Sequence, residues 1–287
     1  MDTIRFFIEY PDIFLIVIAI LSLFIGSFLN VVIYRLPRMM EQNWSEECRI
    51  YLGLKPHTEI EKLNLSLPFS HCPRCKHIIR PWHNIPLLSF LWLRGKCAHC
   101  KANISLRYPL VEALTCVVSV YVAWKFGVTW QTFAGLLFTW ICICLIFIDL
   151  DYHLLPDQLT LSLLWLGLFF SIFNLFTHSH DAIIGAICGY LLFAITQMIF
   201  GWITGKTGMG QGDYKFLAAL GGYLGWQMLP LIILLSSFSG VIFALTYMTI
   251  KKHFKSTPLP FGPYLAVAGW VALLWGDEIM KYYLQAM

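Results

Sequence analysis

Long apolar runs separated by short polar breaks follow one another along most of the chain. A transmembrane helix needs roughly 20 mostly apolar residues, and most of the runs approach or exceed that length. The sixth run, which is rich in glycine, is the shortest. The pattern therefore predicts an all-α polytopic membrane protein with about eight transmembrane helices. The runs cover residues 13–33, 108–124, 130–148, 159–176, 182–203, 216–228, 230–250 and 262–275.

The composition agrees with this fold class. Of the 287 residues, 58% are hydrophobic and 13% are charged, against about 45–50% and about 25% in soluble domains. The mean hydropathy is +0.68. These values exclude a disordered chain, a lysine-coated nucleic-acid-binding protein and an ordinary cytosolic enzyme.

A single long polar stretch interrupts the apolar runs and divides the chain into three parts. We expect a first transmembrane span over residues 1–34, a soluble loop domain over residues 35–107, and a seven-helix membrane core over residues 108–287.

The basic residues favour one orientation in the membrane. Residues 35–107 hold 12 of the 20 Lys and Arg residues. If the spans alternate in direction, the loops near 149–157, 204–215 and 251–261 lie on the same side of the membrane as the long loop. That side then holds 17 Lys and Arg residues, and the other side holds 3. Cytoplasmic loops are enriched in Lys and Arg, so we expect the long loop in the cytoplasm and both termini outside. The net charge of +4 then reports topology, and we expect contact with lipid rather than with nucleic acid.

The long loop contains two Cys-x-x-Cys pairs, Cys72 with Cys75 and Cys97 with Cys100. Each turn of this kind points two thiolates at one ion, and two turns complete a tetrahedral zinc site. Four thiolates leave no open position, so we expect Zn²⁺ with a structural role. A short loop has little core of its own, and zinc would supply folding energy. The predicted fold is thus a helical membrane protein with one zinc-stapled cytoplasmic loop after the first helix.

Two alternatives to this zinc site are free cysteines and a redox pair. Nearby histidines could also replace a cysteine, although we interpret them as surface residues or as neighbours of the site. They are His71, His77, His83 and His99.

Two aspartates lie at the ends of apolar runs. Asp149 directly follows the apolar part of the third run, and Asp213 ends a Gly-x-Gly-Asp turn after the fifth. The predicted topology puts both at the cytoplasmic face, and charged residues in such places commonly mark function. Gly210 and Gly212 lack a Cβ, so the backbone can come close to the acid and to an extended substrate. We interpret Asp151 as an interfacial charge and Asp157 as a helix N-cap.

The two candidate acids suggest aspartyl protease chemistry. Two close carboxylates share a proton because both cannot ionise together. One can then act as general base on a water molecule while the other, protonated, polarises the scissile carbonyl. A proton- or cation-coupled membrane carrier that uses the same carboxylates is the alternative.

Several motifs, in order along the chain, resemble those of the type IV prepilin peptidases, which are bifunctional leader peptidases and N-methyltransferases. The resemblance extends over almost the whole chain. The matching segments are 26–37, the two cysteine pairs, Asp149 with 155–157, the Gly-x-Gly-Asp turn, and 260–266.

The resemblance implies a location in the bacterial inner membrane and a role in type IV pilus or type II secretion systems. The substrates would be prepilins and pseudopilins, cut after a glycine at the cytoplasmic face by Asp149 and Asp213. The new N-terminal residue would then be methylated with S-adenosylmethionine. No residue pattern locates the methyl-transfer site. Gly95, Asn30 and Arg35 are candidates, and the alternatives are a plain turn for Gly95 and a cytoplasmic anchor for Arg35. The oligomeric state is left open.

Overall fold

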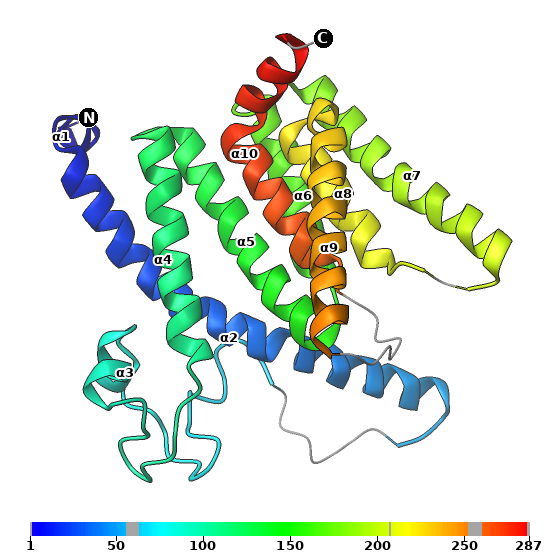
Figure 1. Cartoon of the computed structure of the whole chain (residues 1–287). Helices are drawn as coiled ribbons and strands as arrows, with labels where there is room; N and C mark the ends of the chain where they lie inside the picture. Colours follow the sequence, from blue (N-terminus) through cyan, green and yellow to red (C-terminus); the bar gives the residue numbers. More distant parts are fainter. Residues whose placement is uncertain (1, 56–62, 207, 252–259, 286–287) are drawn as a thin grey trace. The chain divides into compact units, whose positions relative to one another are not determined.

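The computed structural model describes residues 2–55, 63–206, 208–251 and 260–285, and every regular element in these ranges is a helix (Figure 1). Each of the eight predicted runs falls mainly in its own helix, from α2 and α4 to α10. Lys252 and Lys255, which contributed to the expected topology, lie outside the described residues. The elements are α1 Asp2–Glu9, α2 Pro11–Tyr51, η1 Pro81–Asn84, α3 Leu88–Trp92, α4 Arg107–Phe126, α5 Trp130–Tyr152, α6 Asp157–Ile172, α7 Ser179–Thr204, α8 Gln211–Leu224, η2 Trp226–Met228, α9 Leu229–Lys251 and α10 Gly262–Gln285.

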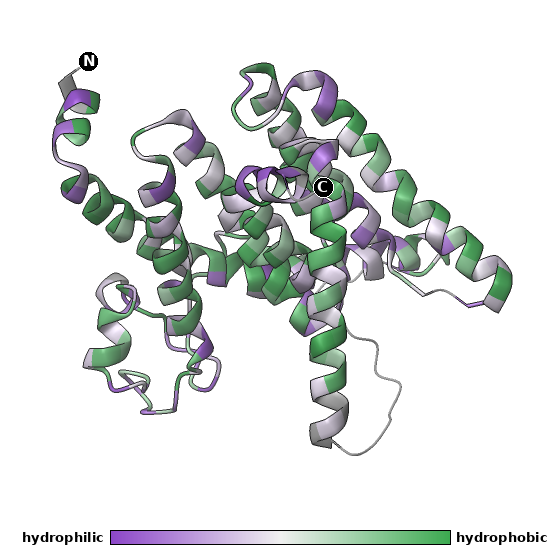
Figure 2. Ribbon diagram, turned by 45° about the horizontal axis from the view of Figure 1, so that its top comes forward, coloured by the Kyte–Doolittle hydropathy of each residue, from purple (hydrophilic) through white to green (hydrophobic). Residues whose placement is uncertain are grey.

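Among the described residues, five segments are long and apolar enough to cross a bilayer: α2, α4, α5, α7, and Trp226–Thr246 in η2 and α9. Hydrophobic residues run along the length of α7 and α9 (Figure 2). The helices α6 and α8 have 16 and 14 residues and are shorter than a full span. The helical membrane fold is therefore confirmed, whereas eight complete spans stay a prediction.

The chain divides into two compact units, residues 1–128 and 129–287. In the first unit α4 packs along α2, and Gly26 lies against the backbone of Glu112 and the side chain of Thr115. The expected boundaries lay after residues 34 and 107, but by its contacts α4 belongs with the first helix and the long loop.

The first span was expected over residues 1–34, and the helix that contains it extends well beyond that boundary. The apolar run ends there, but α2 continues through Pro37 to Tyr51. A proline inside a helix removes one backbone hydrogen bond and bends the helix without having to end it. Figure 1 shows the change of direction within α2.

In the second unit, α8 is buried from Asp213 to Leu224, except at Lys215. It packs closely against its neighbours because glycines bring the backbones together. A Cβ on Gly185 of α7 would overlap the carbonyl of Gly221, and one on Gly167 of α6 would lie 2.8 Å from the Tyr223 backbone. Small residues at helix contacts are the usual means of close packing in membranes.

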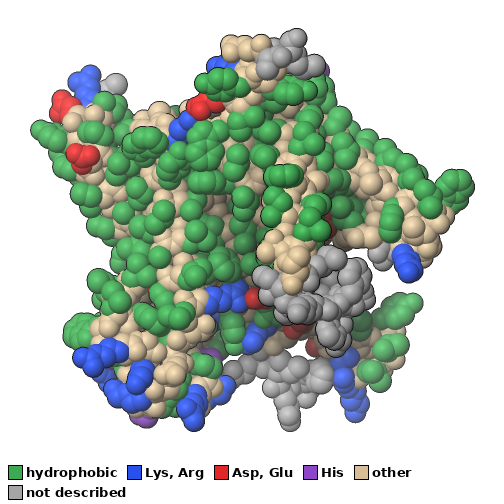
Figure 3. Space-filling model, in the orientation of Figure 1, with side chains coloured by type: hydrophobic (Ala, Val, Ile, Leu, Met, Phe, Trp, Pro, Cys, Tyr) green, Lys and Arg blue, Asp and Glu red, His purple; other side chains and the backbone are tan. Residues whose placement is uncertain are grey.

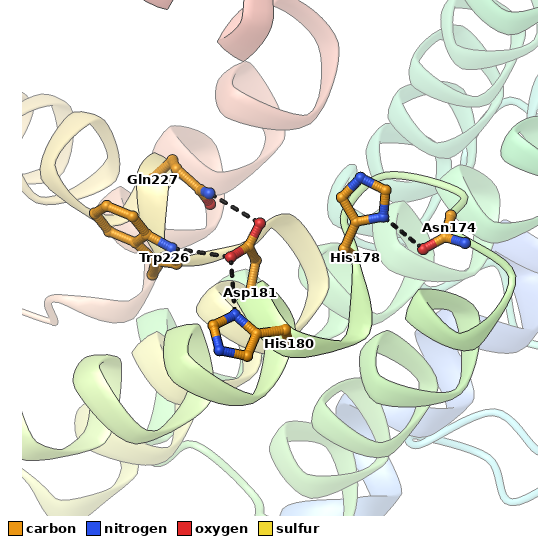
Figure 4. Close-up of polar contacts among 6 residues, drawn as sticks. All are labelled: Asn174, His178, His180, Asp181, Trp226 and Gln227. Atoms are coloured by element: carbon orange, nitrogen blue, oxygen red, sulfur yellow. Dashed lines mark hydrogen bonds and ion pairs between the residues drawn. The ribbon is translucent and has the colours of Figure 1, made fainter.

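A polar cluster lies beside the C-terminal end of α8, the end away from Asp213 (Figure 4). The carboxylate of Asp181, in the first turn of α7, accepts hydrogen bonds from Trp226 Nε1 at 3.1 Å and from Gln227 Nε2 at 3.0 Å. Nearby, His178 and Asn174 pair through Nδ1 and Oδ1 at 2.8 Å. These hydrogen bonds connect the start of α7 to η2, the segment that directly follows α8.

We predict that Gly185→Ala destabilises the second unit, because the added Cβ would overlap the Gly221 carbonyl. Overpacking of this kind costs about 1–3 kcal/mol, so the Tm of the detergent-solubilised protein should fall by several degrees. Gly201→Ala is the matched control in the same helix, since a Cβ there meets no atom nearer than 3.7 Å. Equal melting temperatures for the two variants would contradict the packing described for α7 and α8.

Candidate active site

The two predicted acids come together in the second unit. Asp149 lies in the last turn of α5 and Asp213 in the first turn of α8. Their side chains are 5% and 9% exposed. Leu155 lies against both Gly212, the residue before Asp213, and Gly262, which binds Asp149, so the two acids lie in one region of the unit. The arrangement can therefore hold one shared proton between two carboxyl groups at a single point of the fold.

A backbone group that the sequence did not single out holds one of these acids. The N–H of Gly262, the first residue of α10, donates a hydrogen bond to Asp149 Oδ2 at 2.9 Å. The first N–H groups of a helix have no partner within the helix and are free to bind an anion. A Cβ on Gly262 would lie 2.7 Å from the same oxygen. The only sequence signal was the position of Gly262 in the 260–266 motif.

The glycine turn before Asp213 has one crowded and one open position. A Cβ on Gly212 would lie 2.8 Å from Leu155 Cβ, whereas one on Gly210 would find Asp213 Oδ2 at 3.6 Å, an ordinary contact. Leu155 Cδ2 also lies 2.9 Å from the place of a Cβ on Gly262. Leu155 therefore packs between the two glycines that adjoin the acids.

The other two aspartates of this region lie outside the buried pair. Asp151 is exposed. Asp157 was expected to cap a helix, but Pro156 occupies the N-cap position and Asp157 is the first residue of α6 without a capping bond. Its carboxylate instead binds Lys215 Nζ through both oxygens, at 2.8 and 2.7 Å. This ion pair joins the start of α6 to α8, two residues beyond Asp213.

The four cysteines of the long loop gather at one point in the first unit. Their sulfur atoms all lie within 4.8 Å of one another, and Cys72 Sγ is 3.8 Å from Cys100 Sγ. Tetrahedral zinc with bonds of about 2.3 Å needs sulfur atoms about 3.8 Å apart. The donor set and its spacing therefore fit a tetrahedral metal ion with four thiolate ligands.

Two similar turns position these sulfur atoms. The N–H of Lys76 donates to the Cys72 carbonyl, the N–H of Lys101 donates to the Cys97 carbonyl, and both lysines have φ of 58°. Hydrogen bonds from the backbone N–H groups of Cys75 and Arg74 lower the pKa of the Cys72 thiol to about 6. Metal ligation requires the thiolate, and these hydrogen bonds favour the thiolate of Cys72.

The histidines are not part of this cluster. Among the residues that the structure describes, the metal-binding group consists of the four cysteines. The rings of His77 and His99 stack on each other, with centroids 4.5 Å apart.

Two of the three methyl-transfer candidates use their side chains to bind backbone. Asn30 Nδ2 donates to the Tyr108 carbonyl at 3.1 Å. The buried Arg35 guanidinium donates to the carbonyls of Asn64 at 2.9 Å and Pro68 at 2.6 Å. Both side chains therefore attach membrane helix α2 to later parts of the first unit.

Gly95, the third candidate, follows α3 and has a φ of +67°. Its N–H donates to the Phe90 carbonyl, and its own carbonyl accepts from Ile104 N–H. A Cβ on Gly95 would lie 2.9 Å from the Phe90 ring. The positive φ and the ring both favour glycine at this turn.

Glu112 is a further buried acid that the sequence analysis missed. It is 8% exposed in α4, and its Oε2 accepts a hydrogen bond from the N–H of Leu87 at 2.9 Å. The signal was present, because an acid inside the run 108–124 is costly in a membrane. This hydrogen bond attaches Leu87, the residue before α3, to the membrane helix α4.

The chain is similar to known proteins over both units. Residues 20–126 match the Bacterial Peptidase A24 N-terminal domain, and residues 136–245 match the Type IV leader peptidase family. It is 53% identical over 285 residues to the prepilin leader peptidase/N-methyltransferase of Pseudomonas aeruginosa. The aligned residues cover 99% of this chain and 98% of the relative. The relative of the same name in Neisseria gonorrhoeae is 46% identical over 266 residues, 92% of this chain and 91% of the relative.

No solved structure matches the chain. The two family matches together cover most of its length, and the full-length relatives carry one name. With two buried aspartates in one unit and a four-cysteine cluster in the other, the chain belongs to the type IV leader peptidase family.

Proposed function

We propose that Asp149 and Asp213 form the catalytic pair with which this chain cleaves the leader peptides of prepilins and pseudopilins. Leader cleavage followed by N-methylation is the activity that the family and the names of the relatives indicate. The observation that carries the assignment of residues is the meeting of two buried carboxylates, one of them held by the Gly262 N–H. The carrier alternative has no comparable support, since the relatives are named as enzymes.

The geometry suggests which aspartate acts as general base and which acts as general acid. A hydrogen bond to a carboxylate favours its charged form, and Gly262 gives such a bond to Asp149. In our proposal Asp149 takes a proton from the attacking water, while protonated Asp213 donates to the carbonyl oxygen of the scissile bond. The tetrahedral intermediate then collapses and the C–N bond breaks. The amine leaves with the proton that Asp149 took from water, and Asp213 regains its proton from the former carbonyl oxygen.

We place this cleavage after a glycine, at the cytoplasmic face of the bacterial inner membrane. The concentration of basic residues in the long loop supports this orientation, and Figure 3 shows Lys and Arg side chains gathered on that loop. The basic leader of the substrate would stay in the cytoplasm. The apolar stem would lie in the bilayer, and the bond between them would reach the acids.

We further propose that the four cysteines hold one structural Zn²⁺, because their spacing fits a tetrahedral ion. Zinc would join the two similar turns and so stiffen the segment that contains Gly95. The new N-terminal amine would be methylated near this segment, with S-adenosylmethionine as the methyl donor. Asn30 and Arg35 would serve this reaction by holding the loop in place.

We predict that Asp149→Asn and Asp213→Asn each lower leader cleavage by about 10²–10⁴-fold, because each removes one partner of the acid–base pair. The test is incubation of the purified protein with a prepilin and labelled S-adenosylmethionine, with cleavage and label scored separately. Asp151→Asn, at an exposed position outside the pair, is the control and should cleave normally. Normal cleavage by either pair variant would refute the mechanism.

We predict that Gly262→Ala lowers the rate of cleavage by about 10²-fold, since a Cβ there would displace Asp149 and small misplacements of catalytic groups are costly. The control is Gly240→Ala, whose Cβ would lie 3.6 Å from the Tyr264 ring and needs no rearrangement. Single-turnover cleavage and the Tm should be measured for both. Wild-type cleavage by folded Gly262→Ala would contradict the role of this N–H.

We predict that the purified protein retains about one zinc ion per chain and that Cys72→Ser loses it, because a tetrahedral thiolate site needs all four ligands. Metal content measured by mass spectrometry and limited proteolysis of residues 63–106 report the loss. Cys48→Ser changes an exposed cysteine outside the cluster and is the control. A metal-free preparation with a protease-resistant loop would overturn the zinc proposal.

A further inference from the structure

The short helix α3 and its flanks present a group of exposed apolar side chains. Leu88 is 64% exposed, Leu91 70% and Trp92 86%. Trp82, in the preceding 3-10 helix η1, is 57% exposed. These residues lie in the loop domain, where water would be the default neighbour. A contiguous apolar surface of this kind commonly marks an interaction site.

The anchoring of α3 to α4 fixes its depth relative to the membrane. The Leu87 N–H is bonded to Glu112, which lies five residues into α4 and therefore about 7.5 Å along the helix axis from Arg107. The 20 residues of α4 span about 30 Å, which is the thickness of the hydrocarbon core. Little of α4 can extend outside the core, so the start of α3 must lie within the membrane, close to its surface.

The backbone at Leu87 shows that this attachment is specific. Leu87 has a φ of 58°, a conformation that a bulky residue keeps only where its surroundings enforce it. The other side of α3 is also fixed, because the Phe90 ring packs over Gly95. The helix therefore holds one face against the loop and leaves Leu88, Leu91 and Trp92 on the outer face.

The charges around α3 suit a membrane surface. Arg94 and Lys96 follow the helix directly and are exposed, and the Arg80 guanidinium lies 5.6 Å from the centre of the Trp82 ring. Hydrophobic side chains cover the outer side of the α3 region, and Lys and Arg gather below them (Figure 1 and Figure 3). Tryptophan at the interface with basic residues beyond it is typical of segments that lie in a bilayer surface.

We propose that α3 is an interfacial membrane anchor, with Leu88, Leu91 and Trp92 inserted among the lipids beside α4. The occupant of this apolar face is the bilayer itself. The helix α4, to which the residue before α3 is bonded, also exposes apolar side chains, among them Leu110 at 55% and Val117 at 67%. The anchor holds the Gly95 turn and the adjoining cysteine turns at the membrane surface. The inference stands independently of the peptidase and zinc proposals.

The experiment replaces Trp92 with the photo-crosslinking residue p-benzoylphenylalanine in the full chain. The protein is reconstituted in phosphatidylglycerol/phosphatidylcholine nanodiscs and irradiated. Intact mass spectrometry then measures the fraction of protein that carries a lipid adduct. The control carries the same residue at Arg74, an exposed position in the first cysteine turn. We expect several-fold more lipid adduct from position 92 than from position 74.

Equal lipid adduct from both positions, or crosslinks from position 92 to protein instead of lipid, would overturn the proposal. The Tm of each labelled protein checks its folding, and Leu88 offers a second position if the Trp92 variant does not fold. Neither cleavage nor metal content enters the readout. Failure of this proposal is therefore distinguishable from failure of the proposed function.

Discussion

Two carboxylates buried at the ends of apolar helices are the constraint on which the second unit depends. Removing a carboxylate from water is costly, and a second one nearby raises the cost. Asp149 and Asp213 meet under these conditions. The first N–H of α10 offsets part of the cost at Asp149. A shared proton removes most of the remaining repulsion, and the same proton is what acid–base hydrolysis needs.

The glycine contacts of α8 follow from the need to bring its first turn to Asp149. Side chains at Gly185, Gly221 or Gly167 would hold the helices apart, because the backbones already touch there. Close backbone packing fixes the position of a helix to within a fraction of an ångström, which catalysis requires of its reacting groups. The Asp181 cluster and the pair of Lys215 with Asp157 fix α8 near its two ends. A helix of 14 residues can thus hold Asp213 in a defined position although it is too short to span a bilayer.

Much of this could be predicted from the sequence, because a bilayer demands long apolar helices and makes each charge conspicuous. The helical class, the cysteine cluster and the meeting of the two acids were predicted from the spacing of apolar residues, cysteines and acids. The contact between Gly262 and Asp149 joins residues 113 positions apart, and no local pattern indicates such a partner. The continuation of α2 through Pro37 to Tyr51 was not predicted, because the apolar run that marks the span ends before Pro37. Glu112 was visible as an acid inside an apolar run and was overlooked.

The buried polar residues of the two units differ in their hydrogen-bond partners. In the first unit Asn30, Arg35 and Glu112 are buried, and each is bonded to backbone from a distant part of the loop or from the start of α4. A side chain whose hydrogen bonds are committed to the fold is a poor reagent, since chemistry would have to break those bonds. Asp149 differs from them because another carboxyl group lies in its neighbourhood, in addition to its hydrogen bond from Gly262. The buried polar side chains on the membrane helices of the first unit therefore serve to position the loop.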